Sequence, residues 1–382
     1  MFGRGITLFK LFGFAVRIDL SWLIIAALIT WSLAVGVFPQ MYPDLAVRTY
    51  WIMGIAGALA LFLSIIIHEF SHALVARRYG LQMKGITLFI FGGVAEMTEE
   101  PPSPKVELLM AIAGPIASVF LAAFFFVLGL LGGAAGWRQE AIGVFSYLAL
   151  VNIVLVIFNL VPAFPLDGGR VLRSLLWMWK GNIRWATRIA SQSGSVFGMG
   201  LMILGIVSVF SGNLVGGLWW FLIGMFLRNA AVMSYQQILV RQLLEGEPVS
   251  RFMITEPVTV PRHISVRDLV EDYVYKYHHK MYPVVDEERL VGCVTTKQIK
   301  ELPRDEWDRQ TVGTLAAQCS EANTIPPDAD AMKALAKMSS TKTSRLMVVD
   351  RGKLVGILSL KDLMNLLSVK LELEGEGRAA DV

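Results

Sequence analysis

Long apolar stretches dominate the chain up to about residue 245, and shorter apolar runs interrupted by charges fill the remainder. A helix that crosses a bilayer needs about 20 mostly apolar residues. Six stretches approach or reach that length, at residues 20–37, 52–75, 108–131, 145–164, 189–210 and 214–227 with its continuation. The pattern therefore predicts an α-helical polytopic membrane domain over residues 1–245, with about six transmembrane helices.

A short segment between the second and third stretches has a different pattern. Residues 84–97 are too few to cross the bilayer as a helix, and strand-forming residues flank Gly92 and Gly93. Such backbone is tolerated at membrane depth only where protein or a water-filled cavity satisfies its polar groups. We therefore expect a re-entrant β-hairpin beside a cavity.

The region beyond residue 246 contains two similar units. In each unit an amphipathic helical stretch, at residues 265–277 and 330–339, precedes a strand, an acidic turn, a second strand and a helix. Such a repeat predicts two copies of one structural unit. We expect a soluble α/β module of two domains, residues 246–305 and 306–370, and a polar tail at residues 371–382.

Composition and charge agree with this division. The chain has 382 residues, of which 54% are hydrophobic and 17% charged, whereas soluble proteins carry roughly 25% charged residues. The net charge of +4 includes no dense basic block, so nucleic acid is not an expected partner. Lys and Arg gather on one side of the predicted spans, and the other side has only Arg48 and Arg138. The positive-inside rule then places both termini and the α/β module in the cytoplasm of a multi-pass protein of the cell membrane.

The second apolar stretch contains the chemistry. His68 and His72 are four residues apart, so on a helix both imidazoles project from one face and can bind one Zn²⁺, with Glu69 beside them as general base. Chance could produce this motif on a soluble helix. Ionisable residues inside a span are costly and are functional by default, and these are the only histidines in the first 262 residues.

Catalytic zinc takes a third protein ligand, and Asp167 is the best candidate. It is expected to end the fourth span, where Pro162, Pro165 and two glycines interrupt helical hydrogen bonding. The alternative is an interfacial loop that ends a helix. Asn159 could donate a hydrogen bond to the oxyanion of a peptide-hydrolysis reaction, and a helix-packing amide is an equally good interpretation of its position. At ~1.5 Å per residue, His68 would lie ~13 Å from the cytoplasmic boundary marked by Arg77.

These motifs resemble the site-2 protease family of intramembrane zinc metalloproteases, peptidase family M50, and in particular its six-span members with a C-terminal pair of cystathionine-β-synthase (CBS) domains. The segment from Asn159 to Arg170 fits the family pattern Asn-x-x-Pro-x-x-Pro-Leu-Asp-Gly-Gly-Arg. The resemblance implies zinc ligands at His68, His72 and Asp167, and catalytic roles for Glu69 and Asn159. It further implies that the chain cuts a single-span membrane protein, such as an anti-sigma factor or a pro-transcription factor.

Two other segments resemble parts of the same family. Gly92 and Gly93 match its re-entrant hairpin, whose edge is expected to pair with an unwound substrate segment. The Ala113-Gly114-Pro115 segment matches a third-span motif to which the resemblance assigns a structural role.

The two soluble units resemble CBS domains, which often bind adenosine nucleotides. In the second unit, Ser359 and Asp362 match the positions that contact phosphate and ribose, whereas the first unit has Gln298 in place of the aspartate. At most one good site for ATP, ADP or AMP is therefore expected. The alternative is a nucleotide-free unit for docking or for forming a homodimer.

Two functions from other classes compete with proteolysis. CBS pairs also regulate transporters and channels, in which intramembrane His, Glu and Asp could form an ion path. A catalytically silent membrane scaffold is the third hypothesis. The complete set of His68, Glu69, His72 and Asp167 argues against both, because an ion path does not require it and a scaffold has no use for Glu69.

Overall fold

The computed structural model describes residues 6–11, 14–81, 83–90, 92–97, 100–287, 289–319, 322–341 and 343–375. The chain divides into two compact units, Met1–Gln236 and Gln237–Val382. In the described part of the chain, six helices are long and apolar enough to cross a membrane. The predicted class, a polytopic helical domain followed by an α/β module, is confirmed.

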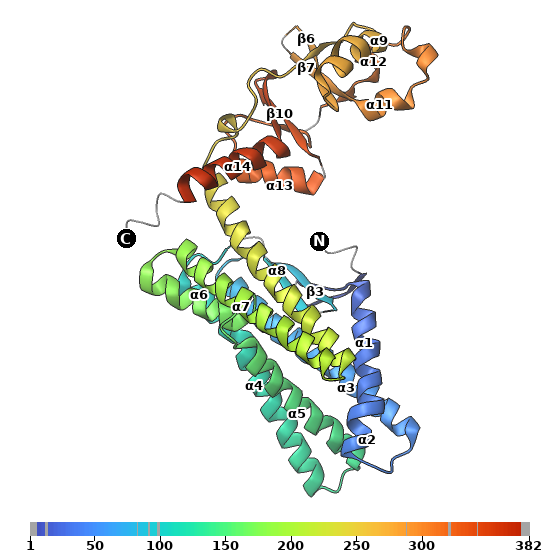
Figure 1. Cartoon of the computed structure of the whole chain (residues 1–382), viewed down its shortest axis with the longest axis vertical. Helices are drawn as coiled ribbons and strands as arrows, with labels where there is room; N and C mark the ends of the chain where they lie inside the picture. Colours follow the sequence, from blue (N-terminus) through green and yellow to red (C-terminus); the bar gives the residue numbers. More distant parts are fainter. Residues whose placement is uncertain are drawn as a thin grey trace. The chain divides into compact units, whose positions relative to one another are not determined.

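The six long helices are seen in Figure 1. The first runs through α1 (Leu20–Ser32), a π-helical turn (Leu33–Val37) and α2 (Phe38–Met41), and the others are α3 (Val47–Arg78), α4 (Pro104–Ala134), α5 (Gln139–Asn159), α7 (Ile183–Phe210) and α8 (Leu214–Leu244). Helix α4 starts where the Ser103 side chain accepts a hydrogen bond from the Val106 N–H, which caps the helix. The predicted fourth span continued five residues too far, because α5 stops at Asn159 before the two prolines.

Close packing of the long helices depends on small residues. Helix α4 packs against α3, α5 and the shorter helix α6 (Asp167–Lys180). A Cβ added to Gly198 of α7 would lie 2.6 Å from the carbonyl oxygen of Gly224 in α8, and Gly205 and Gly217 approach each other in the same way. Backbones of spanning helices come this close only where side chains are absent.

A four-stranded sheet accompanies the helices of the first unit. It contains β1 (Ile6–Leu11), β2 (Phe14–Ile18), β3 (Met83–Phe89) and β4 (Gly92–Met97), in that order. The predicted hairpin is confirmed as the antiparallel pair β3–β4. Sequence analysis missed that β2 pairs with β3 in parallel and so extends the sheet. Strand β4 is an edge strand in the described sheet, with β3 on its other side.

The second unit repeats one hairpin twice. Strands β6 (Met281–Asp286) and β7 (Arg289–Thr295) pair in the same register as β10 (Arg345–Asp350) and β11 (Lys353–Ser359), and a bulge falls at the same place in both pairs. The sheet order is β5-β6-β7-β11-β10-β9, with β8 beside β7. The other strands are short: β5 (Val260–Pro261), β8 (Ala317–Gln318) and β9 (Thr324–Ile325). A helical run comprises α9 (Val266–Asp268), a π-helical turn (Leu269–Val274) and α10 (Tyr275–Tyr277). The other helices are α11 (Thr296–Glu301), α12 (Val312–Leu315), α13 (Ala331–Thr341) and α14 (Leu360–Gly375), and two short 3-10 turns lie at Val249–Arg251 and Arg304–Glu306.

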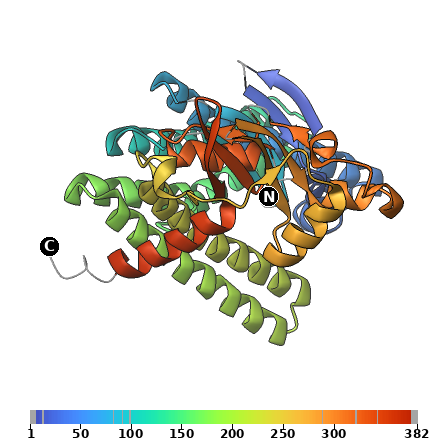
Figure 2. The same ribbon diagram turned by 90° about the horizontal axis from the view of Figure 1, so that it is seen from above.

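Two hydrophobic cores stabilise this unit, one for each hairpin. In the second, Met338 of α13 and Leu363 of α14 pack against Leu346 of β10 and Leu358 of β11, and Figure 2 shows α14, in red, beside these strands. The first core is built from different residues at equivalent positions, with Tyr282 of β6 in the place of Leu346. The predicted repeat therefore corresponds to two domains of one design.

Candidate metal centre

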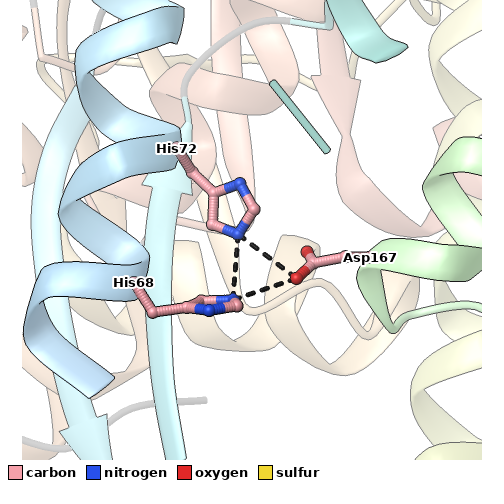
Figure 3. Close-up of side chains that lie close together, drawn as sticks. All are labelled: His68, His72 and Asp167. Atoms are coloured by element: carbon pink, nitrogen blue, oxygen red, sulfur yellow. Dashed lines mark hydrogen bonds and ion pairs between the residues drawn. The ribbon is translucent and has the colours of Figure 1, made fainter. Parts of the chain in front are cut away.

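Three residues meet inside the first unit. His68 and His72 lie one turn apart on α3, and Asp167 is the first residue of α6. The Asp167 Oδ2 atom lies 3.0 Å from His68 Nε2 and 3.3 Å from His72 Nε2, and the two Nε2 atoms are 3.2 Å apart. Figure 3 shows the three side chains converging from two helices. Among the described residues this is the one group of three or more metal-ligating side chains whose ligand atoms lie within 4.8 Å of one another.

The path of the chain into Asp167 differs from the expectation. Asp167 does not end the fourth span, because α5 stops at Asn159 and a turn at residues 160–166 leads into the separate helix α6. Gly169, two residues after Asp167, lets the start of α6 pack closely on this turn. A Cβ at Gly169 would lie 2.5 Å from the Ala163 carbonyl carbon. The prolines and glycines thus do break the helix as predicted, and the break is long enough to start a new helix.

A hydrogen bond holds each imidazole through its Nδ1 atom, on the edge of the ring that faces away from the cluster. His72 Nδ1 lies 2.6 Å from the Met110 carbonyl oxygen, and His68 Nδ1 lies 2.9 Å from Ser118 Oγ, both on α4. A carbonyl oxygen only accepts, so His72 Nδ1 carries the proton and its Nε2 lone pair faces the cluster. Partners of this kind fix the orientation of metal-ligating histidines. Neither partner was predicted from the sequence. The Met110 carbonyl has no sequence signal, whereas Ser118 is a polar residue in an apolar stretch.

Gly114 of α4 lies directly against the two histidines. A Cβ at this position would lie 2.5 Å from His68 Nε2 and 2.7 Å from His72 Cε1, and still closer to His72 Nε2. The resemblance to a family motif assigned a structural role to this glycine. The structure shows a more direct one, since the missing side chain leaves the space into which the ligand nitrogens point.

The donor set and its surroundings fit a zinc ion. Two imidazole nitrogens and one carboxylate oxygen are the ligands of a class of catalytic zinc sites that leave one position open, and the glycine keeps the space between them clear. Helix α6 is not one of the six long apolar helices. Asp167 binds a metal as the ionised carboxylate, because a ligand must be deprotonated.

Glu69 and the hairpin lie next to each other. A Cβ added to Gly93 of β4 would lie 2.8 Å from Glu69 Cγ and 3.3 Å from Ile65 Cγ2. Gly92 has a φ of 129°, a conformation that only glycine adopts without strain. Glu69 is half-buried, and its side chain makes no hydrogen bond within the described part of the chain. The edge strand and the carboxylate beside the metal ligands thus form one continuous region.

Two asparagines of α5 differ in their surroundings. Asn159 is the last residue of the helix, is half-buried, and has no side-chain hydrogen bond among the described residues. Asn152, which sequence analysis did not single out, is fully buried and donates to Ser64 Oγ at 3.3 Å, one turn before His68. A polar residue inside an apolar stretch was the signal that could have identified it.

The residues expected to bind nucleotide, Ser359 and Asp362, lie at the start of α14, and Gln298 lies at the equivalent start of α11. Ser359 precedes α14, and its hydroxyl oxygen accepts a hydrogen bond from the Asp362 N–H at 3.1 Å. At the equivalent place in the first domain, Gln298 Oε1 accepts from the Thr295 N–H at 2.8 Å, and Gln298 Nε2 donates to the Leu315 carbonyl at 3.1 Å. The glutamine amide is therefore fully engaged within its own domain.

Comparisons with known proteins agree with the geometry. The profile of peptidase family M50 matches residues 56–140 and 133–205, and the CBS-domain profile matches residues 249–305 and 319–369. The chain is 35% identical over 369 residues to Rip3, a candidate zinc metalloprotease of Mycobacterium tuberculosis, covering 96% of this chain and 93% of the relative. It is 28% identical over 372 residues to a zinc metalloprotease of Methanocaldococcus jannaschii, covering 97% and 98%.

A solved structure of the same kind is also similar. The site-2 protease from Methanocaldococcus jannaschii matches with 26% identity and a TM-score of 0.42, covering 60% of this chain and 94% of that one. The family is shown by the full-length relatives, and the resemblance first noted in the motifs is confirmed. The chain belongs to peptidase family M50 and is a zinc metalloprotease of the site-2 protease type with a C-terminal pair of CBS domains.

Proposed function

We propose that this protein hydrolyses peptide bonds in or near a transmembrane segment of another membrane protein, and that nucleotide binding to its CBS pair regulates this reaction. The observation that carries the proposal is the convergence of His68, His72 and Asp167, whose ligand atoms lie within 4.8 Å of one another. The two histidines are buried in α3, a helix long and apolar enough to span a membrane. A hydrolytic site inside such a helix would act on substrates that reach it within the bilayer.

Each residue of the site has a proposed role. His68 Nε2, His72 Nε2 and an Asp167 carboxylate oxygen would hold the zinc ion. When bound, the ion supplies a Lewis acid that polarises a carbonyl group and acidifies water towards neutral pH. The Glu69 carboxylate accepts a proton from water and later donates it to the leaving nitrogen. Asn159, whose amide has no hydrogen-bond partner among the residues that the structure describes, would donate a hydrogen bond to the oxyanion.

The edge strand β4 is the proposed substrate-binding element. Its outer side is open among the described residues, and Gly93 packs on the side chain of Glu69. A substrate segment that unwinds and adds to this edge gains main-chain hydrogen bonds and lies beside the catalytic carboxylate. Gly92 and Gly93 lack side chains, so they allow the substrate backbone to approach closely.

The expected substrate is a single-span membrane protein, such as an anti-sigma factor or a pro-transcription factor. The distribution of Lys and Arg along the chain supports a protein of the cell membrane whose termini and CBS pair face the cytoplasm. A cleavage site on that side would release a cytoplasmic fragment. A homodimer formed through the CBS pair is part of the same proposal.

Adenine nucleotide is the proposed regulator. Ser359 and Asp362 hydrogen-bond to each other at the start of α14, where a helix N-terminus favours phosphate. Calorimetry on the intact protein with ATP and with AMP tests this assignment. Asp362→Ala should weaken binding, whereas Gln298→Ala, at the equivalent position of the first domain, should leave it unchanged. The absence of nucleotide binding by the unaltered protein would contradict the regulatory part of the proposal.

The decisive experiment concerns Glu69. Glu69→Gln should retain one zinc per chain and lose cleavage of a model transmembrane substrate by at least ~10²-fold, the range expected for a positioned acid–base group. The control is Glu140→Gln, the same change at a residue in the first turn of α5, which should cleave normally. Cleavage by Glu69→Gln at the wild-type rate would refute the role of Glu69. Quantitative comparison of membrane proteins in cells with the active and Glu69→Gln forms would then identify the substrate by its truncation.

A further inference from the structure

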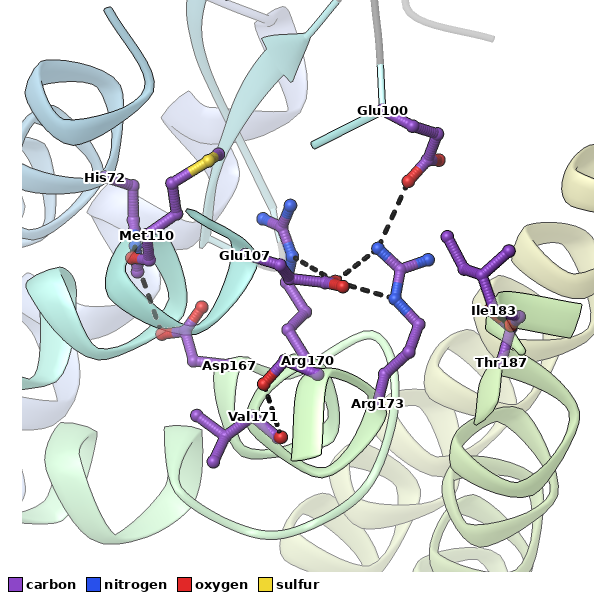
Figure 4. A network of polar contacts seen from close by, with 11 residues as sticks. His72, Glu100, Glu107, Met110, Asp167, Arg170, Val171, Arg173, Ile183 and Thr187 are labelled. Atoms are coloured by element: carbon purple, nitrogen blue, oxygen red, sulfur yellow. Dashed lines mark hydrogen bonds and ion pairs between the residues drawn. The ribbon is translucent and has the colours of Figure 1, made fainter. Parts of the chain in front are cut away.

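One face of α4 contacts the two histidines of the metal cluster and the helix that carries Asp167. Met110, Gly114 and Ser118 lie on this face at helical spacing, and all three touch the histidines of α3. Glu107 lies one turn before Met110 on the same face, and it points to α6 instead. Figure 4 shows the Glu107 carboxylate between the guanidinium groups of Arg170 and Arg173 of α6. Helix α4 therefore bridges the element that carries the histidines and the element that carries Asp167.

Glu107 and Arg173 form a buried ion pair. The side chain of Glu107 is 0% exposed and that of Arg173 is 3% exposed. Arg173 Nε donates to Glu107 Oε1 at 2.6 Å, and Arg173 Nη2 lies against the same oxygen. Arg170 Nε lies 3.9 Å from this oxygen as well. Two charges are removed from water here, which is costly unless the pair is well aligned.

The Arg173 guanidinium reaches two more segments. Its Nη2 donates to Glu100 Oε2 at 3.2 Å, and Glu100 follows β4, the proposed substrate-binding strand. Its Cζ lies 5.2 Å from the ring centre of Phe164, in the turn that leads into Asp167. One side chain thus contacts α4, the segment after β4 and the turn before the proposed metal ligand.

We infer that the Glu107–Arg173 ion pair is a positioning device for zinc binding, which holds α6 on α4 so that Asp167 meets the two histidines. Arg173 lies six residues after Asp167 on α6, about 9 Å along the helix axis. A tilt or slide of α6 on α4 therefore displaces the Asp167 carboxylate directly. Metal ligands must be held to within about 0.5 Å, and two guanidinium N–H groups aimed at one carboxylate oxygen are more directional than apolar packing.

This inference rests on the proposed role of Asp167 as a zinc ligand. Because the pair acts on the position of a ligand, its loss should appear in metal affinity before it appears in folding. Glu107→Gln keeps the shape of the side chain and removes its charge. Arg173→Lys keeps the charge and removes the forked donor that serves both carboxylates. Both variants are gentler than truncation, so they separate positioning from loss of the fold.

The test measures zinc affinity of the purified full-length protein in detergent by competition with a chromogenic chelator. Glu107→Gln and Arg173→Lys should each raise the zinc dissociation constant about tenfold or more, the range found when outer partners of metal ligands are changed. With Co²⁺ in place of zinc, the visible absorption bands should shift in both variants, because the Asp167 oxygen is displaced. Thermal melting in the presence of chelator should fall in Glu107→Gln, which leaves a buried guanidinium without this partner. It should remain closer to that of the wild type in Arg173→Lys, which keeps the charge.

Glu100→Gln is the matched control. It makes the same carboxylate-to-amide change in a partner of the same Arg173 guanidinium, but at a half-exposed residue outside α4. It should alter the zinc dissociation constant less than about twofold, because the hydrogen bonds that orient the histidines come from α4. Wild-type affinity and an unchanged Co²⁺ spectrum in Glu107→Gln and Arg173→Lys would overturn the inference. An equal loss of affinity in Glu100→Gln would also overturn it, since the effect would not depend on the link to α4. The proposed function fails separately, if the wild type binds no zinc.

Discussion

Replacing Gly114 by alanine tests the geometry of the metal centre most sharply. The new Cβ would lie 2.5 Å from His68 Nε2 and 2.7 Å from His72 Cε1. Zinc binds imidazole nitrogen at about 2.0–2.1 Å, so a carbon atom at this place competes with the ion for the same space. The overlap is relieved only if the imidazoles turn away or α4 separates from α3.

The cost of that movement can be worked out from the contacts that it breaks. Turning both rings away gives up the hydrogen bonds to Ser118 Oγ and to the Met110 carbonyl, 2.9 and 2.6 Å long. At about 0.5–1.5 kcal/mol each, the loss is roughly 1–3 kcal/mol, equivalent to about 5- to 150-fold in zinc affinity before the direct overlap is counted. Alanine also favours the helix by about 1 kcal/mol relative to glycine, so the metal-free protein should remain folded.

The assay is the zinc content of the purified protein after dialysis, together with thermal melting in chelator. Gly114→Ala should hold far less than one zinc per chain and should melt close to the wild type in the metal-free state. Gly133→Ala provides the control, because it makes the same change on the same helix where a Cβ has nothing within 4 Å. Stoichiometric zinc bound with wild-type affinity in Gly114→Ala would refute the placement of the metal between the histidines and α4.

Two further predictions concern the hairpin and the CBS pair. Gly93→Ala places a Cβ 2.8 Å from Glu69 Cγ, so it should displace the general base. We expect kcat for a model substrate to fall about tenfold, while the zinc content stays at the wild-type level. An unchanged kcat would show that the hairpin does not position the catalytic carboxylate. Leu346→Ala empties a fully buried site in the core of the second CBS domain, so it should destabilise that domain by about 2–5 kcal/mol. Hydrogen exchange of the β10 amides in the intact protein measures this loss, and exchange at the wild-type rate would contradict the assigned core.

Sequence by itself determined the features that depend on local spacing. Apolar length predicted the six spans, because a helix must satisfy its backbone hydrogen bonds across the bilayer. The interval of four residues placed His68 and His72 on one helix face, since that interval is close to one turn. Strand-forming residues around Gly92 and Gly93 predicted the hairpin, and the repeated strand pattern predicted the paired domains. Each of these is a property of neighbouring residues.

Tertiary structure alone decided which distant residues meet at the centre. Asp167 was suggested by its type and by the broken helix before it, but its meeting with His68 depends on how α6 packs on α4. Glu107, Gly114 and Ser118 lie at helical spacing on one face of α4, so small and polar residues mark this face in the sequence. Only long-range packing decides that this face meets α3 and α6, because that choice depends on residues far away in the chain.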